Sequence, residues 1–157
     1  MAIKSETNRK GLCLLLALTV LVTAYIFGNS LKNGEESHES SNKVVEIVEP
    51  VVKPITEKLP GEKGVSFWVR KAAHVAEFFA LGLCAMALGL GLQKRFGAAC
   101  LGYVLFYVLL VAVTDEYIPS FTGRTSSVKD VFIDLGGAVL GIGAAALVGT
   151  VRKRNRK

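Results

Sequence analysis

Residues 67–92 read FWVRKAAHVAEFFALGLCAMALGLGL. A helix crosses a hydrocarbon layer of roughly 30 Å with about 20 residues, so this apolar run is long enough to span a membrane. Three further runs of similar character cover Gly11–Ser30, Phe96–Thr114 and Asp130–Val151. With 51% hydrophobic residues in a chain of 157, the sequence is too apolar for a soluble domain of this length. We therefore expect an all-α fold, a polytopic transmembrane bundle of four helices.

The basic residues predict how this bundle is oriented. They gather at the ends of the apolar runs and are not interleaved with aromatic residues, which argues against nucleic-acid binding. Ten cations and one anion lie before the first run, between the second and third, and after the fourth, whereas the opposite side holds nine cations and twelve anions. Because basic segments stay in the cytoplasm, we predict a multi-pass membrane protein of N-in/C-in topology, with the Gln93–Arg95 turn inside.

Three regions follow from this topology. Residues 1–30 form the cytoplasmic N-terminus and first transmembrane helix, residues 31–66 an extracytoplasmic loop, and residues 67–157 a three-helix region with a basic cytoplasmic tail. Within the loop, Pro50 and Pro54 interrupt valines at helix-like spacing, which predicts broken amphipathic turns on the membrane surface. The alternative for the first region is a cleavable signal peptide. It is less favoured because the run approaches spanning length and Tyr25-Ile26-Phe27 stands where small residues are expected.

Carboxylates occur inside the predicted spans. Counted at about 1.5 Å per residue from the cytoplasmic ends of their runs, four of them lie about 22 to 31 Å up a layer of roughly 30 Å. They are Glu77, Asp115, Asp130 and Asp134. We therefore expect all four to lie at a similar depth, near the outer side of the membrane.

The ionisable residues also share helix faces. Lys71, His74 and Glu77 recur at spacing three, and Asp130 and Asp134 at spacing four, so each set lines one stripe. A charge at the bilayer centre costs at least about 2.5 kcal/mol, and such residues usually mark functional pockets. The alternative is purely structural, with side chains that reach the interface or ion pairs such as Lys71–Glu77 and Arg124–Asp130. The pocket is favoured because a histidine, several carboxylates and a guanidinium all gather on one side.

Small residues on the same runs predict close helix packing. Glycines recur within the second and fourth runs, and small residues allow transmembrane backbones to approach one another. The positions are Gly82, Gly89, Gly91, Gly137, Gly141 and Ala145.

Three ordered motifs between Val69 and Gly143 resemble the VanZ-like family of bacterial membrane proteins. They are Lys71-Ala-Ala-His74-Val-Ala-Glu77-Phe-Phe-Ala-Leu81-Gly82, then Thr114-Asp115-Glu116, then Gly123-Arg124 through Asp130-Val-Phe-Ile-Asp134-Leu-Gly-Gly137. The family usually places a Gln three positions after its Asp-Glu pair. This chain has no equivalent of that Gln, and its stretch before Arg124 is one residue shorter. The founding member is associated with resistance to the glycopeptide teicoplanin, and the family looks related to membrane proteins proposed to process lipid head groups.

The resemblance and the residues together suggest a membrane enzyme of the outer leaflet. Its substrate would be a phosphate-containing lipid or a lipid-linked cell-wall intermediate. The expected catalytic residues are His74, Glu77, Asp115 and Glu116. His74 would act as general base or nucleophile, with Glu77 orienting its imidazole, and Asp115 or Glu116 would donate a proton to the leaving group. The expected substrate-binding residues are Lys71, Arg124, Asp130 and Asp134, with the two cations holding the phosphate.

Other functions remain open at this point. In a metal-dependent variant, His74, Glu77, Asp115 and Asp130 would supply the ligands, but two nearby cations would repel the ion. We therefore expect no metal and no other cofactor. A non-catalytic protein that binds or shields a cell-wall precursor is the main alternative. A transporter or proton relay is less favoured because the charges do not form a path across the membrane.

Overall fold

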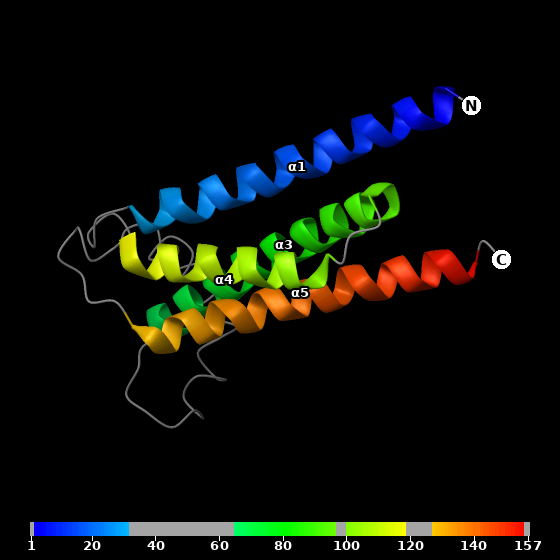
Figure 1. Cartoon of the computed structure of the whole chain (residues 1–157). Coiled ribbons are helices and arrows are strands. Elements are labelled where there is room, and N and C mark those ends of the chain that lie inside the picture. Colours follow the sequence, from blue (N-terminus) through cyan, green and yellow to red (C-terminus); the bar gives the residue numbers. More distant parts are fainter. Residues whose placement is uncertain (1, 32–64, 97–99, 119–126, 156–157) are drawn as a thin grey trace.

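A computed structural model describes residues 2–31, 65–96, 100–118 and 127–155, and this part of the chain is all helical, as predicted. The four helices are α1 (Ala2–Ser30), α3 (Val65–Phe96), α4 (Leu101–Tyr117) and α5 (Val128–Arg154) (Figure 1). The predicted surface turns around Pro50 and Pro54 lie outside the described residues.

Three of these helices are long and apolar enough to cross a membrane. The segments concerned are Arg9–Ser30, Phe67–Lys94 and Val128–Val151, which agree with the predicted first, second and fourth spans to within two residues at each end. Helix α4 has 17 residues and is therefore only about 26 Å long, somewhat shorter than the roughly 30 Å layer.

The predicted third span was wrong at both ends. Phe96 is the last residue of α3, so the expected turn at Gln93–Arg95 is helical, and α4 begins only at Leu101. Gln, Lys and Arg are good helix formers, which explains why a basic segment that separates two apolar runs still extends the preceding helix. At the other end α4 continues past Thr114 to Tyr117, shortly before Pro119, a residue that cannot continue a helix.

The helices alternate in direction, so both termini lie at the same end of the bundle (Figure 1). The opposite end, which we call the site end, gathers the last residues of α1 and α4 and the first residues of α3 and α5, namely Ser30, Tyr117, Val65 and Val128. As a result α3 and α5 run parallel to one another, and a residue near the start of one lies close to a residue near the start of the other.

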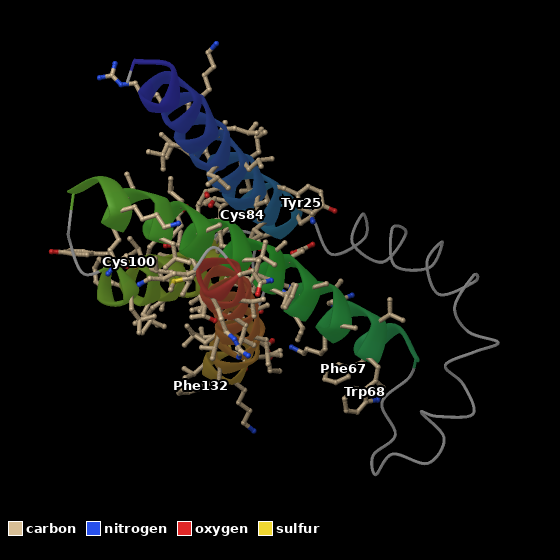
Figure 2. All side chains as sticks on the ribbon, turned by 90° about the vertical axis from the view of Figure 1, so that its right-hand side faces the viewer. Tyr25, Phe67, Trp68, Cys84, Cys100 and Phe132 are labelled. Atoms are coloured by element: carbon tan, nitrogen blue, oxygen red, sulfur yellow. The ribbon has the colours of Figure 1, made fainter. Side chains whose placement is uncertain are left out.

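Aromatic residues mark the site end of α3. Phe67 and Trp68 contact each other edge to face in its first turn, with ring centroids 5.5 Å apart (Figure 2). Trp is enriched at membrane interfaces, where its amphipathic ring lies at the level of the head groups. His74 follows Trp68 by six residues, or about 9 Å along the helix, so its side chain would lie below this level.

The outside of the bundle is apolar. Several large side chains are more than 60% exposed, among them Leu14, Leu21, Phe106, Phe132 and Leu147, and the Phe132 ring lies on the periphery in Figure 2. Apolar exposure of this extent is unusual on a soluble monomer and matches the surface that faces lipid in a membrane protein.

Backbone contact between α3 and α5 holds the centre of the bundle together. A methyl group added at Gly82 or Gly141 would collide with the carbonyl oxygen of Ala138 or Phe79, respectively, and one added at Gly137 would lie 2.5 Å from that of Val75. The expected close packing at these three glycines is thus confirmed. Gly137 follows Asp134 by one turn of α5, and Val75 directly follows His74 of α3. This contact therefore also sets the distance between α3 and α5 at the site.

Candidate functional site

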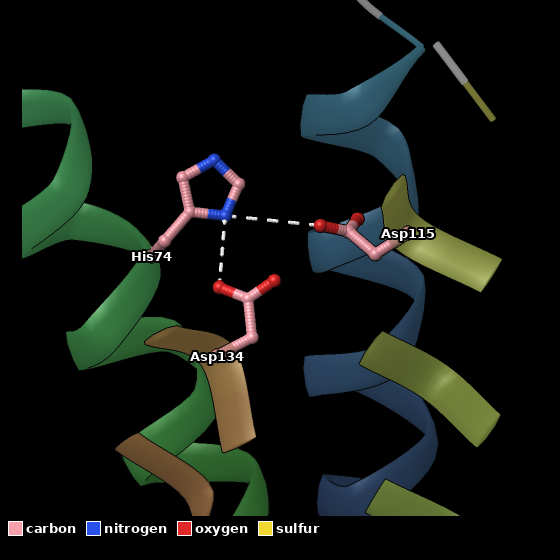
Figure 3. Close-up of side chains that lie close together, drawn as sticks. All are labelled: His74, Asp115 and Asp134. Carbon is pink, nitrogen blue, oxygen red and sulfur yellow. Dashed lines mark ion pairs between the residues drawn. The ribbon is translucent and has the colours of Figure 1, made fainter. Parts of the chain in front are cut away.

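Three ionisable side chains from three helices meet below the site end (Figure 3). His74 of α3 directs its Nδ1 atom toward Asp115 Oδ2 of α4, at 3.7 Å, and toward Asp134 Oδ1 of α5, at 3.5 Å. Both aspartate side chains are only 1% exposed, whereas that of His74 is 30% exposed. We call these residues the His–Asp cluster. The imidazole is therefore the part of the cluster that a molecule from outside can reach.

The cluster contains buried polar atoms without a hydrogen-bond partner. Among the described residues these include Nδ1 of His74, Oδ2 of Asp115 and both carboxylate oxygens of Asp134. At 3.5 and 3.7 Å, the two separations from Nδ1 exceed the length of an ordinary N–H···O hydrogen bond, about 2.7 to 3.2 Å. Since an unsatisfied buried polar group costs about 1 to 3 kcal/mol, more if charged, this arrangement lowers the stability of the fold.

Helix α1 adds two polar residues to this region. Ser30 Oγ donates a hydrogen bond to Asp115 Oδ1 at 2.5 Å, and Asn29 Nδ2 donates one to Glu77 Oε1 at 2.8 Å. Neither residue is among those predicted from the sequence to belong to the site. They form a polar pair at the site end of an otherwise apolar run, close to the carboxylates, and this is the signal that could have identified them. Glu77, expected to orient His74, is thus hydrogen-bonded to α1, while the imidazole faces two aspartates.

A second pair of charges lies one turn closer to the site end. Lys71 and Asp130 form an ion pair between α3 and α5, and the Lys71 ammonium also lies 5.5 Å from the centre of the Phe67 ring. The two predicted stripes therefore face each other, with Lys71 opposite Asp130 and His74 opposite Asp134. The structural alternative predicts two other ion pairs, Lys71–Glu77 and Arg124–Asp130.

Two predicted site residues remain, Glu116 and Arg124. Glu116 accepts a hydrogen bond from the backbone nitrogen of Ser127 at 2.5 Å, which ties the end of α4 to the start of α5. Arg124 lies outside the described residues, so its position relative to the cluster stays a prediction. The structure thus brings His74, Asp115 and Asp134 into one cluster and places the other described candidates, Lys71, Glu77, Glu116 and Asp130, in interactions around it.

A separate cavity of about 430 Å³ lies between α1, α3 and α4. Its lining is largely apolar and includes Leu16, Leu88, Leu92 and Tyr103. It shares no residue with the His–Asp cluster and extends toward the end of the bundle that holds the termini. The polar site is therefore not part of this cavity.

Comparison with known proteins supports the resemblance that the motifs suggest. A family model described as VanZ/LLP1 matches residues 15–149, which include the whole His–Asp cluster and the Ser30 hydroxyl that holds Asp115. Neither the curated proteins nor the solved structures contain a match to this chain. The family match covers most of the sequence and extends the resemblance from the last three helices to α1. The chain therefore belongs to the VanZ/LLP1 family.

Proposed function

We propose that this protein is an enzyme of the outer membrane leaflet that processes a phosphate-containing lipid or a lipid-linked cell-wall intermediate. The observation that carries the proposal is the His–Asp cluster, in which two aspartates that are 1% exposed meet a partly exposed imidazole. Nδ1 of His74, Oδ2 of Asp115 and both carboxylate oxygens of Asp134 have no hydrogen-bond partner among the described residues. Ionisable groups at membrane depth are rare because they are expensive, so they are usually retained for function.

The geometry suggests a role for each residue. Because Nδ1 of His74 faces the two carboxylates, the other ring nitrogen points away from them and is free to exchange a proton with the substrate (Figure 3). Asp115 and Asp134 fix the ring and offset the charge that develops on it. Lys71, which is 17% exposed and lies one turn closer to the interface, would meet the phosphate, with Arg124 as a second cation.

The orientation is part of the proposal. Both termini lie at one end of the bundle, and the segments at that end carry ten cations against one anion. The positive-inside rule then supports an N-in/C-in topology in the bacterial cell membrane, with the site end facing outward. With that orientation, the cluster would lie next to the outer leaflet, where it could meet a lipid-linked cell-wall intermediate.

Cysteine labelling tests this orientation. In a variant whose native cysteines are replaced by Ser, Lys129→Cys at the site end is expected to react with a membrane-impermeant thiol reagent in intact cells. Lys153→Cys, the matched substitution at the opposite end, is expected to react only after the membrane is permeabilised. The reverse pattern would place the site on the cytoplasmic side and contradict the proposal.

Lipid turnover tests the function itself. Purified protein in vesicles, supplied with radiolabelled phosphate-containing lipids, is expected to release a labelled head group or phosphate. Loss of the imidazole in His74→Ala should reduce this turnover at least about 100-fold, the usual contribution of a general acid or base. His38→Ala serves as the matched control because it removes the other histidine of the chain, and it should keep full activity.

The same variants separate the enzyme from the alternative. If the wild-type protein turns over none of the lipids, the enzyme proposal is wrong. A non-catalytic role in binding or shielding a cell-wall precursor would be supported instead if His74→Ala, at matched abundance, still lowers the tolerance of cells to teicoplanin. If the wild-type protein does turn over a lipid, lower teicoplanin tolerance of cells with His74→Ala would link the reaction to glycopeptide resistance.

A further inference from the structure

The His–Asp cluster has the form of a metal site. Three possible ligand atoms, one each from His74, Asp115 and Asp134, lie within 4.8 Å of one another. They come from α3, α4 and α5, so the arrangement depends on the folded bundle and does not arise from neighbours in sequence.

Three carboxylate oxygens of the two buried aspartates lack a hydrogen-bond partner in the part of the chain that the structure describes. Each of these aspartates is 1% exposed, and the oxygens concerned are Oδ2 of Asp115 and both carboxylate oxygens of Asp134. An N–H group on His74 Nδ1 can donate one hydrogen bond, yet two carboxylates face this single atom. A proton on the imidazole would therefore leave several lone pairs unsatisfied. A metal ion bound between the three side chains would accept one lone pair from each of them.

The separations fit an ion. A tetrahedral metal with donor atoms at about 2.1 Å holds them about 3.4 Å apart. The observed distances from Nδ1 are 3.5 Å to Asp134 Oδ1 and 3.7 Å to Asp115 Oδ2. Since all three possible ligand atoms lie within 4.8 Å of one another, an inward movement of the side chains would bring them to coordination distance.

Neighbouring residues support the same reading. Ser30 donates to Asp115 Oδ1 and so fixes this carboxylate with its other oxygen toward the cluster, an arrangement common behind metal ligands. Two aspartates also carry the charge that a divalent ion balances, with a neutral imidazole as third ligand. The sequence predicts no metal because Lys71 and Arg124 would repel the ion. In the structure, however, the Lys71 charge is offset by its ion pair with Asp130.

We propose that His74, Asp115 and Asp134 bind one divalent transition-metal ion, with Zn²⁺ or Mn²⁺ as the best candidates. A set of one imidazole nitrogen and two carboxylate oxygens suits ions that accept both donor types, whereas Ca²⁺ prefers six or more oxygens and Mg²⁺ keeps most of its water. The partly exposed His74 leaves one side of the cluster open to a further ligand, such as water or a phosphate oxygen. This inference does not depend on lipid turnover, since ion binding is measured without a substrate.

Ion binding to the full-length protein tests the inference. The protein is stripped with a chelator in detergent, and then Zn²⁺, Mn²⁺ or Mg²⁺ is added. We expect one Zn²⁺ or Mn²⁺ per chain by equilibrium dialysis, and a melting temperature about 5 °C higher or more at a hundredfold excess over Kd. Mg²⁺ should give a smaller shift. Asp134→Asn and Asp115→Asn should each bind at least about 100-fold more weakly.

Asp130→Asn is the matched control, because it removes a carboxylate of the same kind one turn away, outside the three ligands. Because the Lys71 charge is then no longer offset, this variant is expected to bind the ion up to about tenfold more weakly, well short of the loss in the two ligand variants. A cooperative melting transition in each variant shows that it is folded. Equal binding by the wild type and both ligand variants, or no binding by the wild type, would overturn the inference, whatever the outcome of the lipid assay.

Discussion

Asp134→Asn is expected to lower lipid turnover at least about 100-fold while the bundle stays folded. The substitution keeps the shape of the side chain but removes the negative charge that lies 3.5 Å from His74 Nδ1. The imidazole then loses one of the two groups that orient it, and any cation in the cluster loses a ligand. Turnover of the labelled lipid by purified variants in vesicles measures the effect.

Asp130→Asn is again the comparison. Its carboxylate is 31% exposed and pairs with Lys71 at the rim, so its loss should reduce turnover by only about tenfold or less. If both substitutions had the same effect, the buried position of Asp134 beside His74 would not matter. The activity would then have to be assigned to the rim.

Gly137→Ala is expected to destabilise the folded bundle by about 1 to 3 kcal/mol and to impair turnover as well. The added methyl group would lie 2.5 Å from the carbonyl oxygen of Val75, and a backbone atom cannot move aside as a flexible side chain can. Helix α5 must therefore shift away from α3. Since Asp134 lies one turn before Gly137 and His74 directly precedes Val75, the shift also opens the cluster.

Gly136→Ala provides a matched control on the same helix. A methyl group there would meet nothing within 4 Å, so the substitution should be neutral or slightly stabilising, as expected when Ala replaces Gly within a helix. Chemical denaturation in detergent distinguishes the two variants. Equal stability of both would show that α3 and α5 are not in backbone contact at Gly137.

The sequence predicted the helices well because membrane spans are defined by the length of their apolar runs. Helix ends were harder. The segment Gln93–Arg95 combines the charge expected of a cytoplasmic turn with strong helix propensity, and propensity prevailed, so α3 extends to Phe96. Charge indicates on which side a segment lies, but it does not indicate where the helix stops.

The position of the candidate site along the helices and its helix faces could be predicted from the sequence, but the pairings of its side chains could not. The spacings in α3 and α5 correctly placed Lys71 and His74 on a stripe that faces Asp130 and Asp134. Which carboxylate meets which partner depends on the rotation of each helix, and this is set by the glycine contacts between α3 and α5. Sequence spacing alone cannot give that rotation, so neither the two aspartates that face His74 nor the hydrogen bond between Glu77 and Asn29 could be predicted from it.

The role of α1 could not be predicted from charge, because Asn29 and Ser30 carry none. Their hydrogen bonds to Glu77 and Asp115 show that a fourth helix contributes to the site. Short uncharged polar residues at the outer end of a span are common and are easily taken for the start of a loop. Only the proximity of Asn29 and Ser30 to carboxylates distinguishes them from residues that begin a loop.

The melting temperature of Asp134→Asn, compared with that of the wild-type protein in the presence of a chelator, tests most directly whether the His–Asp cluster is kept for function. If the buried, unpaired carboxylates are retained for a ligand or a reaction, removing one charge relieves repulsion and desolvation. The variant should then melt roughly 3 °C or more above the wild type, as expected for a gain of about 1 kcal/mol. If instead Asp134 and His74 form an ion pair that holds the helices together, the variant will melt well below the wild type, and the cluster is structural.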